Sequence, residues 1–416
     1  MMRGGALMAM LLVDTGTGAY VPPRAIDVAR RHGGNWSQRS GISLTEAEQQ
    51  EDARLGVSNP HTQGGPLLGN ADLSAVLQVD TTGSTFSWYV TKTDAWSTTD
   101  IFGLGMVTLQ LPALNGSSQS FIWQDLGSAT TFIAAGANVS DDSMSGGVVV
   151  RMSSFVAATT NILVTTVNIS SPRPTQLLVS NAVYAGLTYE LDPKTRMPTG
   201  APPRTLKNCT SFDNNGVRNR GGNRAGFADS DANTMWGLFI QCTNGTSEAS
   251  RLGLATRVLT ADTTKPSSGS VEISEPECGP VADHAGTLSA CTTTVSVDAG
   301  TTSLTVLSSS LSNINMAGDG TPGPPTTLEN VEALRKATID LIDAATAAGT
   351  VTTLQAEHED SWAAYWNSSA VSFPSHPDFE AYYYRSMYLL GSSTHETSAV
   401  PPGLCGAWFA GQGPVS

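Results

Sequence analysis

The densest polar triplet with a histidine is His358-Glu359-Asp360. These residue types can transfer protons or bind a metal ion. Consecutive residues of a helix point in different directions, so the three side chains cannot converge on one ligand. The triplet therefore predicts a solvated helix face. The adjacent acids Asp141 and Asp142 could bind calcium in a loop, but the 12-residue pattern of a calcium-binding loop does not surround them.

Motifs of metalloproteases, serine hydrolases and nucleotide-binding proteins are missing from the sequence, which contains no HExxH, GxSxG or P-loop pattern. None of the cysteines forms a CxxC pair, and this argues against zinc or thioredoxin-like chemistry. The sequence therefore indicates no metal site and no cofactor.

The charge balance also restricts the partners. The net charge is −14, and an acidic surface repels phosphate backbones, so nucleic-acid binding is not expected. The one basic cluster, Arg218, Arg220 and Arg224, predicts a surface loop rather than a phosphate site. Hydrophobic residues make up 40% of the chain, enough for a buried core.

The N-terminus fits a signal peptide over residues 1–19. Met1-Met2-Arg3 is followed by an apolar run from Ala6 to Val13 and then by small residues. This pattern predicts a secreted protein. No stretch approaches the about 20 apolar residues of a membrane-spanning helix, so no membrane span is expected.

Two further patterns are typical of secreted proteins. Local spacing predicts the disulfides Cys209–Cys242 and Cys278–Cys291, which leaves Cys405 to pair with sequence beyond this chain. Asn-x-Ser/Thr sequons predict glycosylation along the whole chain. These sequons are at Asn35, Asn115, Asn138, Asn168, Asn208, Asn244 and Asn367.

Most of the chain reads as strands. Residues 20–60 show little periodicity and predict an irregular segment. From 61 to 316, short runs alternate Thr, Val and aromatic residues, for example Met106 to Leu111 and Ile162 to Val167. Many strands with few helical gaps predict a mainly β fold, a large antiparallel sandwich.

The period changes after a Gly/Pro-rich linker over 317–327. Apolar residues at helical spacing predict linker helices over 328–370, the second of them carrying Trp362 and Trp366. A third helix is predicted from Ser375, where Ser375-x-x-Asp378 matches a capping box. Its apolar face is expected to consist of Phe379, Tyr382, Tyr383, Ser386, Met387 and Leu390.

Two segments resemble a known group of proteins. Gly69-Asn70-Ala71-Asp72-Leu73-Ser74-Ala75 resembles the GNGDLGA entry strand of six-hairpin glycosidase-like proteins, and Thr91-Lys92-Thr93-Asp94-Ala95-Trp96-Ser97 resembles a KTDAW segment in their N-terminal sandwich domain. The stretch from His358 to Trp408 is similar to the linker helix and first barrel helix of family 65 and family 95 glycoside hydrolases. The sequence departs from the pattern in Asn70-Ala71-Asp72, where a glycine is usual, and at Cys405.

The resemblance implies a fold and an activity. The fold is a β-supersandwich, a helical linker and an (α/α)6 toroid, and residues 371–416 then form the start of a truncated toroid. The implied activity is glycoside hydrolysis, with acid and base carboxylates in the toroid beyond this chain. Asp378 and Glu380 suit a first helical turn, and Glu396 suits a solvated loop. The chain is therefore expected to be the non-catalytic N-terminal part of a glycoside hydrolase-like protein acting on carbohydrate.

The resemblance also implies sugar contacts. Trp96 and Trp408 lie in segments that border the cleft between sandwich and toroid in the family, and tryptophan faces stack on sugar rings. Lys92 and Asp94 share the strand face of Trp96 and are candidates for the same role, and a charge pair that structures this loop is the alternative. Trp96 and Trp408 could equally be packing residues.

A rival interpretation has no catalysis. The chain could be a secreted carbohydrate-binding or structural sandwich glycoprotein. The helix over 375–392 discriminates between the two, because a finished binding protein should bury its apolar face, whereas the front part of an enzyme would leave that face open.

Overall fold

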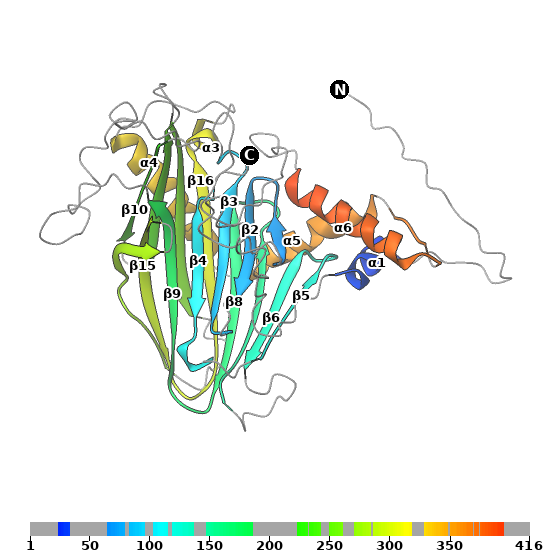
Figure 1. Ribbon diagram of the computed structural model, residues 1–416, viewed down its shortest axis with the longest axis horizontal. Coiled ribbons are helices and arrows are strands. Elements are labelled where there is room, and N and C mark those ends of the chain that lie inside the picture. The colour runs from blue at the N-terminus through cyan, green and yellow to red at the C-terminus, as the bar shows by residue number, and fades with distance from the viewer. Residues whose placement is uncertain are drawn as a thin grey trace, which may run out of the picture.

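The computed structural model contains two antiparallel eight-stranded sheets that pack face to face, followed by helices (Figure 1). The fold class is thus a mainly β sandwich with C-terminal helices, as the alternating runs predict. The structure describes residues 24–33, 65–79, 83–95, 103–114, 119–136, 147–185, 223–231, 233–242, 249–260, 270–283, 286–317, 328–347, 350–368, 370–373 and 375–394.

The first sheet has the strand order β1-β2-β3-β4-β9-β15-β13, and β14 also pairs with β15. Its strands are β1 (Leu67–Gly69), β2 (Leu73–Val79), β3 (Thr85–Lys92), β4 (Gly105–Gln110), β9 (Thr175–Ala185), β13 (Val271–Ile273), β14 (Glu277–Asp283) and β15 (Gly286–Val297).

The second sheet has the order β10-β11-β12-β16-β8-β7-β6-β5. Its strands are β5 (Gln119–Asp125), β6 (Thr130–Gly136), β7 (Val149–Val156), β8 (Ile162–Ser171), β10 (Asn223–Asp231), β11 (Thr234–Cys242), β12 (Ala249–Thr260) and β16 (Gly300–Ser312).

The main core lies between the two sheets. It is built by the side chains of alternate residues along the strands, among them Phe86, Trp88 and Phe239, each 0% exposed. The alternation is clear in β3, whose burial changes with every residue over most of its length. Sequence periodicity therefore finds the core face of these strands directly.

The helices cover part of the second sheet. They are α1 (Ala25–Arg31), the short α3 (Asn313–Ala317), α4 (Leu328–Thr346), α5 (Thr350–Asn367) and α6 (Pro377–Ser393), with the one-turn 3-10 helix η1 (Pro112–Leu114) between strands. Helix α4 packs on β12 and β16, where Ser309 Oγ donates a hydrogen bond to Thr338 O at 2.7 Å. Helices α1, α5 and α6 form a group beside β5 and β6 (Figure 1).

Two sequence expectations differ from the structure. The segment 20–60 is predicted to be irregular, yet Ala25–Arg31 forms helix α1, whose buried face packs against α5 and α6. Helix α6 does not use the Ser375-x-x-Asp378 capping box. It begins at Pro377, and its N-cap, His376, makes no side-chain capping bond. Proline is favoured at this position because its fixed φ is already helical.

One of the two expected disulfides is present in the structure. Cys278 and Cys291 are directly opposite in the β14–β15 ladder and form a disulfide. Cys209 and Cys405 lie outside the described residues, so the pairing predicted for Cys209 with Cys242 stays a prediction.

Candidate functional site

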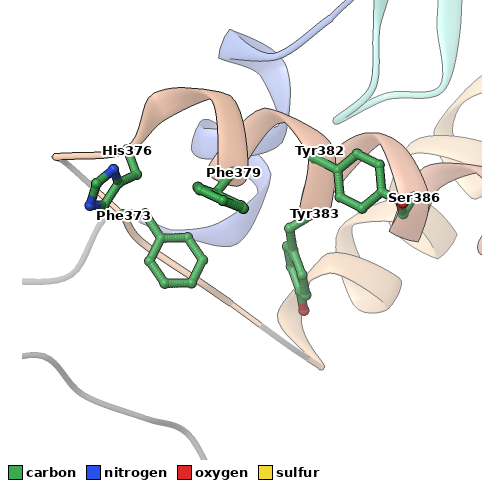
Figure 2. A pocket seen from close by; sticks show the side chains of 6 residues that line it. All are labelled: Phe373, His376, Phe379, Tyr382, Tyr383 and Ser386. Carbon is green, nitrogen blue, oxygen red and sulfur yellow. The ribbon is translucent and has the colours of Figure 1, made fainter.

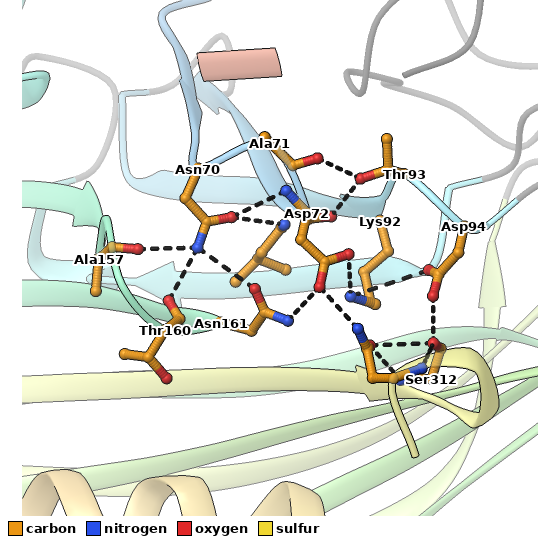
Figure 3. Close-up of polar contacts among 12 residues, drawn as sticks. Asn70, Ala71, Asp72, Lys92, Thr93, Asp94, Ala157, Thr160, Asn161 and Ser312 are labelled. Carbon is orange, nitrogen blue, oxygen red and sulfur yellow. Dashed lines mark hydrogen bonds and ion pairs between the residues drawn. The ribbon is translucent and has the colours of Figure 1, made fainter. Parts of the chain in front are cut away.

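The charged residues of the two motif segments meet in the interior (Figure 3). Lys92 Nζ lies 2.7 Å from Asp72 Oδ1 and 3.9 Å from Asp94 Oδ1. Lys92 is the last residue of β3, and Asp72 directly precedes β2, so the β2–β3 pairing brings them together. The exposed fraction is 0% for Lys92 and 1% for Asp94. In this geometry the polar atoms of Lys92 and Asp94 face each other and Asp72 rather than the surface.

This group reaches across to the second sheet. Asp72 Oδ2 accepts hydrogen bonds from Asn161 Nδ2 at 2.6 Å and from Asn315 Nδ2 at 2.9 Å. Asp94 Oδ2 accepts a hydrogen bond from Ser312 Oγ. Asn161 directly precedes β8, while Ser312 ends β16 and Asn315 lies in α3. These contacts connect the ends of both sheets, and we call the set Asn70, Asp72, Lys92, Asp94, Asn161, Ser312 and Asn315 the polar cluster.

Asn70 fixes the loop that carries Asp72. Its amide nitrogen donates to the backbone oxygens of Ala157 at 2.9 Å and Thr160 at 3.0 Å. Its side-chain oxygen accepts the backbone N–H groups of Asp72 at 3.1 Å and Leu73 at 2.8 Å. The asparagine thus satisfies backbone groups of two strand ends that would otherwise be buried without partners.

The same loop holds helix α6. The backbone N–H of Ala71 donates to Ser392 O at 2.7 Å, and a Cβ on Gly69 would meet that oxygen at 2.7 Å. Ala71 has φ 74°, the left-handed region that favours glycine. Ala71 replaces the second glycine of the GNGDLGA pattern, and it therefore occupies a backbone conformation that glycine would adopt without strain.

Burial controls the ionisation of the cluster. Burial raises the pKa of Asp94, and the attraction of Lys92 does not offset this. Burial also acts on Asp72, but Lys92 and the two asparagine amides outweigh it and hold its pKa below the usual value. Two neighbouring carboxyl groups, one with a raised pKa and one with a lowered pKa, would suit acid–base chemistry, yet neither is accessible to a substrate. The cluster is therefore built to join the two sheets.

The expected stacking residues cannot be placed. Trp96 and Trp408 lie outside the described residues, so their role as sugar contacts stays a prediction. Trp362 and Trp366 of α5 are buried in an aromatic group with Tyr384 and Tyr388 of α6. Their ring centroids lie 5.3 Å apart for Trp362–Tyr388 and 5.6 Å apart for Trp366–Tyr384.

Hydrogen bonds attach this aromatic group to the sandwich. Trp366 Nε1 donates to Leu126 O at 3.0 Å, and Tyr388 Oη donates to Leu67 O at 2.5 Å. Gln124 Nε2 donates to Tyr388 Oη at 2.9 Å. Burial raises the pKa of Tyr388, so its hydroxyl stays a donor. The aromatic residues of α5 and of the inner face of α6 thus serve packing.

His358 is buried, contrary to the solvated helix face predicted for the triplet. Glu359 and Asp360 are exposed, whereas His358 is 1% exposed and lies against the ring of Phe155 at 4.6 Å. Its Nε2 donates to Ser128 O at 2.8 Å. Burial lowers its pKa to about 4. The three residues diverge because the helix turns each one in its own direction, and only His358 faces the sheet.

A second histidine connects α1 to α6. His32 Nε2 lies 2.8 Å from Glu380 Oε1, and Phe373 N–H donates to Glu380 Oε2 at 2.7 Å. Burial works against the charge on Glu380, but these contacts outweigh it and lower its pKa. Glu380 therefore anchors the start of α6, which agrees with the structural role predicted for it.

The outer face of α6 is apolar and open to solvent (Figure 2). The exposed fractions are 68% for Phe379, 74% for Tyr382 and 51% for Leu390. These belong to the face predicted from sequence, whereas Tyr383 and Met387 of that predicted face pack against the buried aromatic group. The buried face of α6 carries Glu380 and Tyr384. A shallow hollow of about 420 Å³ lies on this surface, lined by Phe373, His376, Phe379, Tyr382, Tyr383 and Ser386.

The second sheet exposes an aromatic pair that the sequence analysis does not single out. Phe121 and Trp123 of β5 are 40% and 43% exposed, while Ile122 between them is in the core. Trp123 is stacked on Phe132 of β6 with ring centroids 5.3 Å apart. The signal in the sequence is the alternation Ser120-Phe-Ile-Trp-Gln124, in which both faces of the strand carry an apolar residue.

Two of the predicted glycosylation sites can be located. Asn168 of β8 and Asn367 at the end of α5 are exposed. The remaining sequon asparagines lie outside the described residues. Within the described part of the chain, no group of three His, Cys, Asp or Glu side chains could hold a metal ion, and no helix is long and apolar enough to cross a membrane.

The comparisons find distant structural neighbours only. No family model matches the chain, and no curated protein matches it. A family GH92 α-mannosidase from Bacteroides thetaiotaomicron aligns with a TM-score of 0.32 and 9% identity, over 79% of this chain and 38% of that one. A heparinase III aligns with a TM-score of 0.27 and 9% identity, over 58% of this chain and 36% of that one.

A heparan sulfate lyase from Pedobacter heparinus aligns with a TM-score of 0.28 and 8% identity, over 64% of this chain and 39% of that one. This chain thus spans less than two fifths of the length of the solved chains it aligns with, from 36% to 39%. These neighbours are carbohydrate-active enzymes by their names. Similarity at this level establishes neither their activity nor their domain arrangement for this chain.

Proposed function

We propose that this chain is the non-catalytic N-terminal part of a glycoside hydrolase-like protein, in which the sandwich and linker helices present α6 to a further helical domain. The observation that supports the proposal most is the open aromatic face of α6. Phe379, Tyr382, Ser386 and Leu390 follow the spacing of a helix-packing ridge. Large apolar side chains at this exposure are normally covered by a partner.

Helix α6 is prepared for such a partner on its inner side. Tyr384 and Tyr388 fix it to α5 and to the sandwich, and Ser392 fixes its last turn to the Ala71 loop. A helix held at three places presents its outer face in one orientation. The small Ser386 in the middle of that face would allow a second helix to approach closely.

The acids of the polar cluster and of α6 support a non-catalytic role. Glycoside hydrolysis needs two carboxyl groups on opposite sides of an accessible bond. Asp72 and Asp94 are buried, and Glu380 is held by His32 and a backbone N–H. Asp378 is exposed on the first turn of α6, where the helix dipole favours an acid.

Sequencing the transcript beyond the codon for Ser416 tests the proposal first. We expect an open reading frame that encodes pairs of amphipathic helices with further Asp and Glu residues. A stop codon directly after Ser416 would contradict it. The purified chain alone should not hydrolyse aryl glycosides, and an activity that disappears with Asp378→Asn would also count against it.

The α6 surface can be tested with the longer product. The double variant Phe379→Ser, Tyr382→Ser should abolish co-purification of this chain with the separately expressed downstream helices. The matched control is Glu359→Ser on the exposed side of α5, which should leave the complex intact. Equal binding by both variants would remove α6 from the interface.

We also propose that the protein is secreted. The disulfide Cys278–Cys291 and the exposed sequons at Asn168 and Asn367 support this localisation. Mass spectrometry of protein from the culture medium of its native host should find oxidised Cys278 and glycan on at least one of these asparagines. Protein found only inside cells, with free thiols and no glycan, would overturn it.

A further inference from the structure

We propose that the outer surface of β5–β8 binds a neutral glycan chain. This surface is on the opposite side of the second sheet from the core and is distinct from the outer face of α6. The inference stands independently of the proposed partner for α6. It rests on the aromatic pair of β5 and on what the strand register places beside it.

Two register rows cross this surface. In one row, Trp123 is opposite Phe132, which is opposite Ser153, which is opposite Thr166 and then Thr305. The neighbouring row contains Phe121, Ala134, Arg151, Asn168 and Ser303. Because side chains directly opposite one another share a face of the sheet, all of them point outward with the exposed Phe121 and Trp123.

The rows change in character across the sheet. The β5 and β6 end carries aromatic rings. The β7, β8 and β16 end carries Arg151 together with hydroxyl and amide side chains, all of them exposed or half-buried. From β5 to β8 the row extends over three strand spacings, about 14 Å. A glycan needs both kinds of surface at this scale, since one face of a sugar ring is apolar and its rim is covered by hydroxyl groups.

The helices leave this part of the sheet open. Helix α4 covers β12 and β16 farther along, and α5 covers Phe155, two residues beyond Ser153 on the same face of β7. Phe121 and Trp123 remain 40% and 43% exposed beside them. The covered and uncovered parts differ in side chains as well, because the covered part is aliphatic around Phe155 and Val164, whereas the open part is aromatic and polar.

The charges favour a neutral ligand. Arg151 is the only ionisable residue in the two rows. The chain as a whole carries a net charge of −14, which disfavours a polyanion. The helices that pack on this sheet contact mainly aliphatic side chains, such as Val164 and Leu307. Rings beside hydroxyl groups on a flat face suit the alternating apolar faces and hydroxyl rims of a polysaccharide instead.

The test is affinity electrophoresis of the whole chain in gels that contain mannan, xylan, galactan or mixed-linkage β-glucan. The protein is made in a bacterial host that adds no glycan to Asn168, so that its own glycan cannot occupy the surface. At least one polysaccharide should retard the chain. Trp123→Ala should weaken this binding at least 10-fold, and Phe121→Ala several-fold.

The matched control is Phe379→Ala, which removes an exposed aromatic ring from α6 and should bind like the unchanged chain. Phe121→Ala serves as the second variant if loss of the Trp123–Phe132 stack lowers the melting temperature. No retardation by any of the four polysaccharides would overturn the proposal. So would unchanged binding by Trp123→Ala and Phe121→Ala, or an equal loss in Phe379→Ala.

These outcomes are separate from those for the proposed function. If no polysaccharide binds the unchanged chain but the complex through α6 forms, only the proposal for the sheet surface is rejected. A stop codon after Ser416 together with Trp123-dependent retardation would reject the enzyme-part proposal and leave a carbohydrate-binding sandwich.

Discussion

The polar cluster and the outer face of α6 reverse the usual distribution of residue types. In the polar cluster, Lys92 and Asp94 are charged residues with almost no exposed surface, whereas Phe379 and Tyr382 on α6 are apolar residues that are 68% and 74% exposed. A buried charge is tolerated only with partners, and the polar cluster supplies them from both sheets. An exposed aromatic face has no such internal compensation, so it points to something outside the described chain. From residue types alone, the charged side chains would be expected at the surface and the aromatic face of α6 in the interior.

The largest effect is expected from breaking the polar cluster. Lys92→Ala leaves Asp72 and Asp94 buried without their cation and should lower the free energy of unfolding by about 3–5 kcal/mol. Chemical denaturation measures this. The control is Lys336→Ala, which removes the exposed ion pair with Asp340 and should cost no more than about 0.5 kcal/mol. A loss below about 1 kcal/mol for Lys92→Ala would mean that the cluster does not hold the sheets together.

The two faces of α6 should respond differently to the same change. Tyr384→Ala removes a ring with 0% exposure and the hydrogen bond from its hydroxyl to Val371 O, and should cost about 3 kcal/mol. Tyr382→Ala on the outer face should change the free energy of unfolding by no more than about 0.5 kcal/mol. Denaturant titration of both variants distinguishes them. Similar losses would show that the outer face is covered within the chain.

His358 should make stability depend on pH. Its pKa is about 4 in the folded state against 6.5 when solvated. As pH falls below 6.5, the unfolded state takes up the proton first, so stability is lost by about 1.4 kcal/mol per pH unit until about pH 4, where the loss levels off. His358→Gln should flatten this part of the stability curve. An unchanged slope in His358→Gln would refute the role of burial.

The smallest effect is a gain at the loop that joins the polar cluster to α6. Ala71→Gly should raise the free energy of unfolding by about 1 kcal/mol, because glycine adopts φ 74° without steric strain. Ala75→Gly in strand β2 should have the opposite sign, since glycine weakens a strand interior. Thermal melting of the two variants gives the comparison, and a loss in Ala71→Gly would show that the loop is not strained there.

Much of the fold could be predicted from the sequence because strand and helix periods are local. The alternating runs locate strands in both sheets, such as β4 and β8, and the change of period after residue 327 locates α4 and α5. The N-terminal helix α1 was missed because its seven residues are too few for a clear period and its burial depends on α5 and α6. The helix start predicted from the capping box at Ser375 was wrong, because Pro377 is a better first residue for the helix.

The candidate sites were less accessible to sequence reasoning. From the sequence by itself came the expectation that the GNADLS and KTDAW segments belong to one sandwich domain, and that one face of α6 is apolar. It also determined which residues of a strand share a face, because the strand period is two. Only the tertiary structure decided that Asp72 and Asn161 meet across 89 positions of sequence, that His358 faces Phe155, and that the aromatic rings of β5 and the outer face of α6 stay exposed. The physical reason is that exposure and long-range pairing depend on which surfaces pack together, and this is a property of the whole chain rather than of any local pattern.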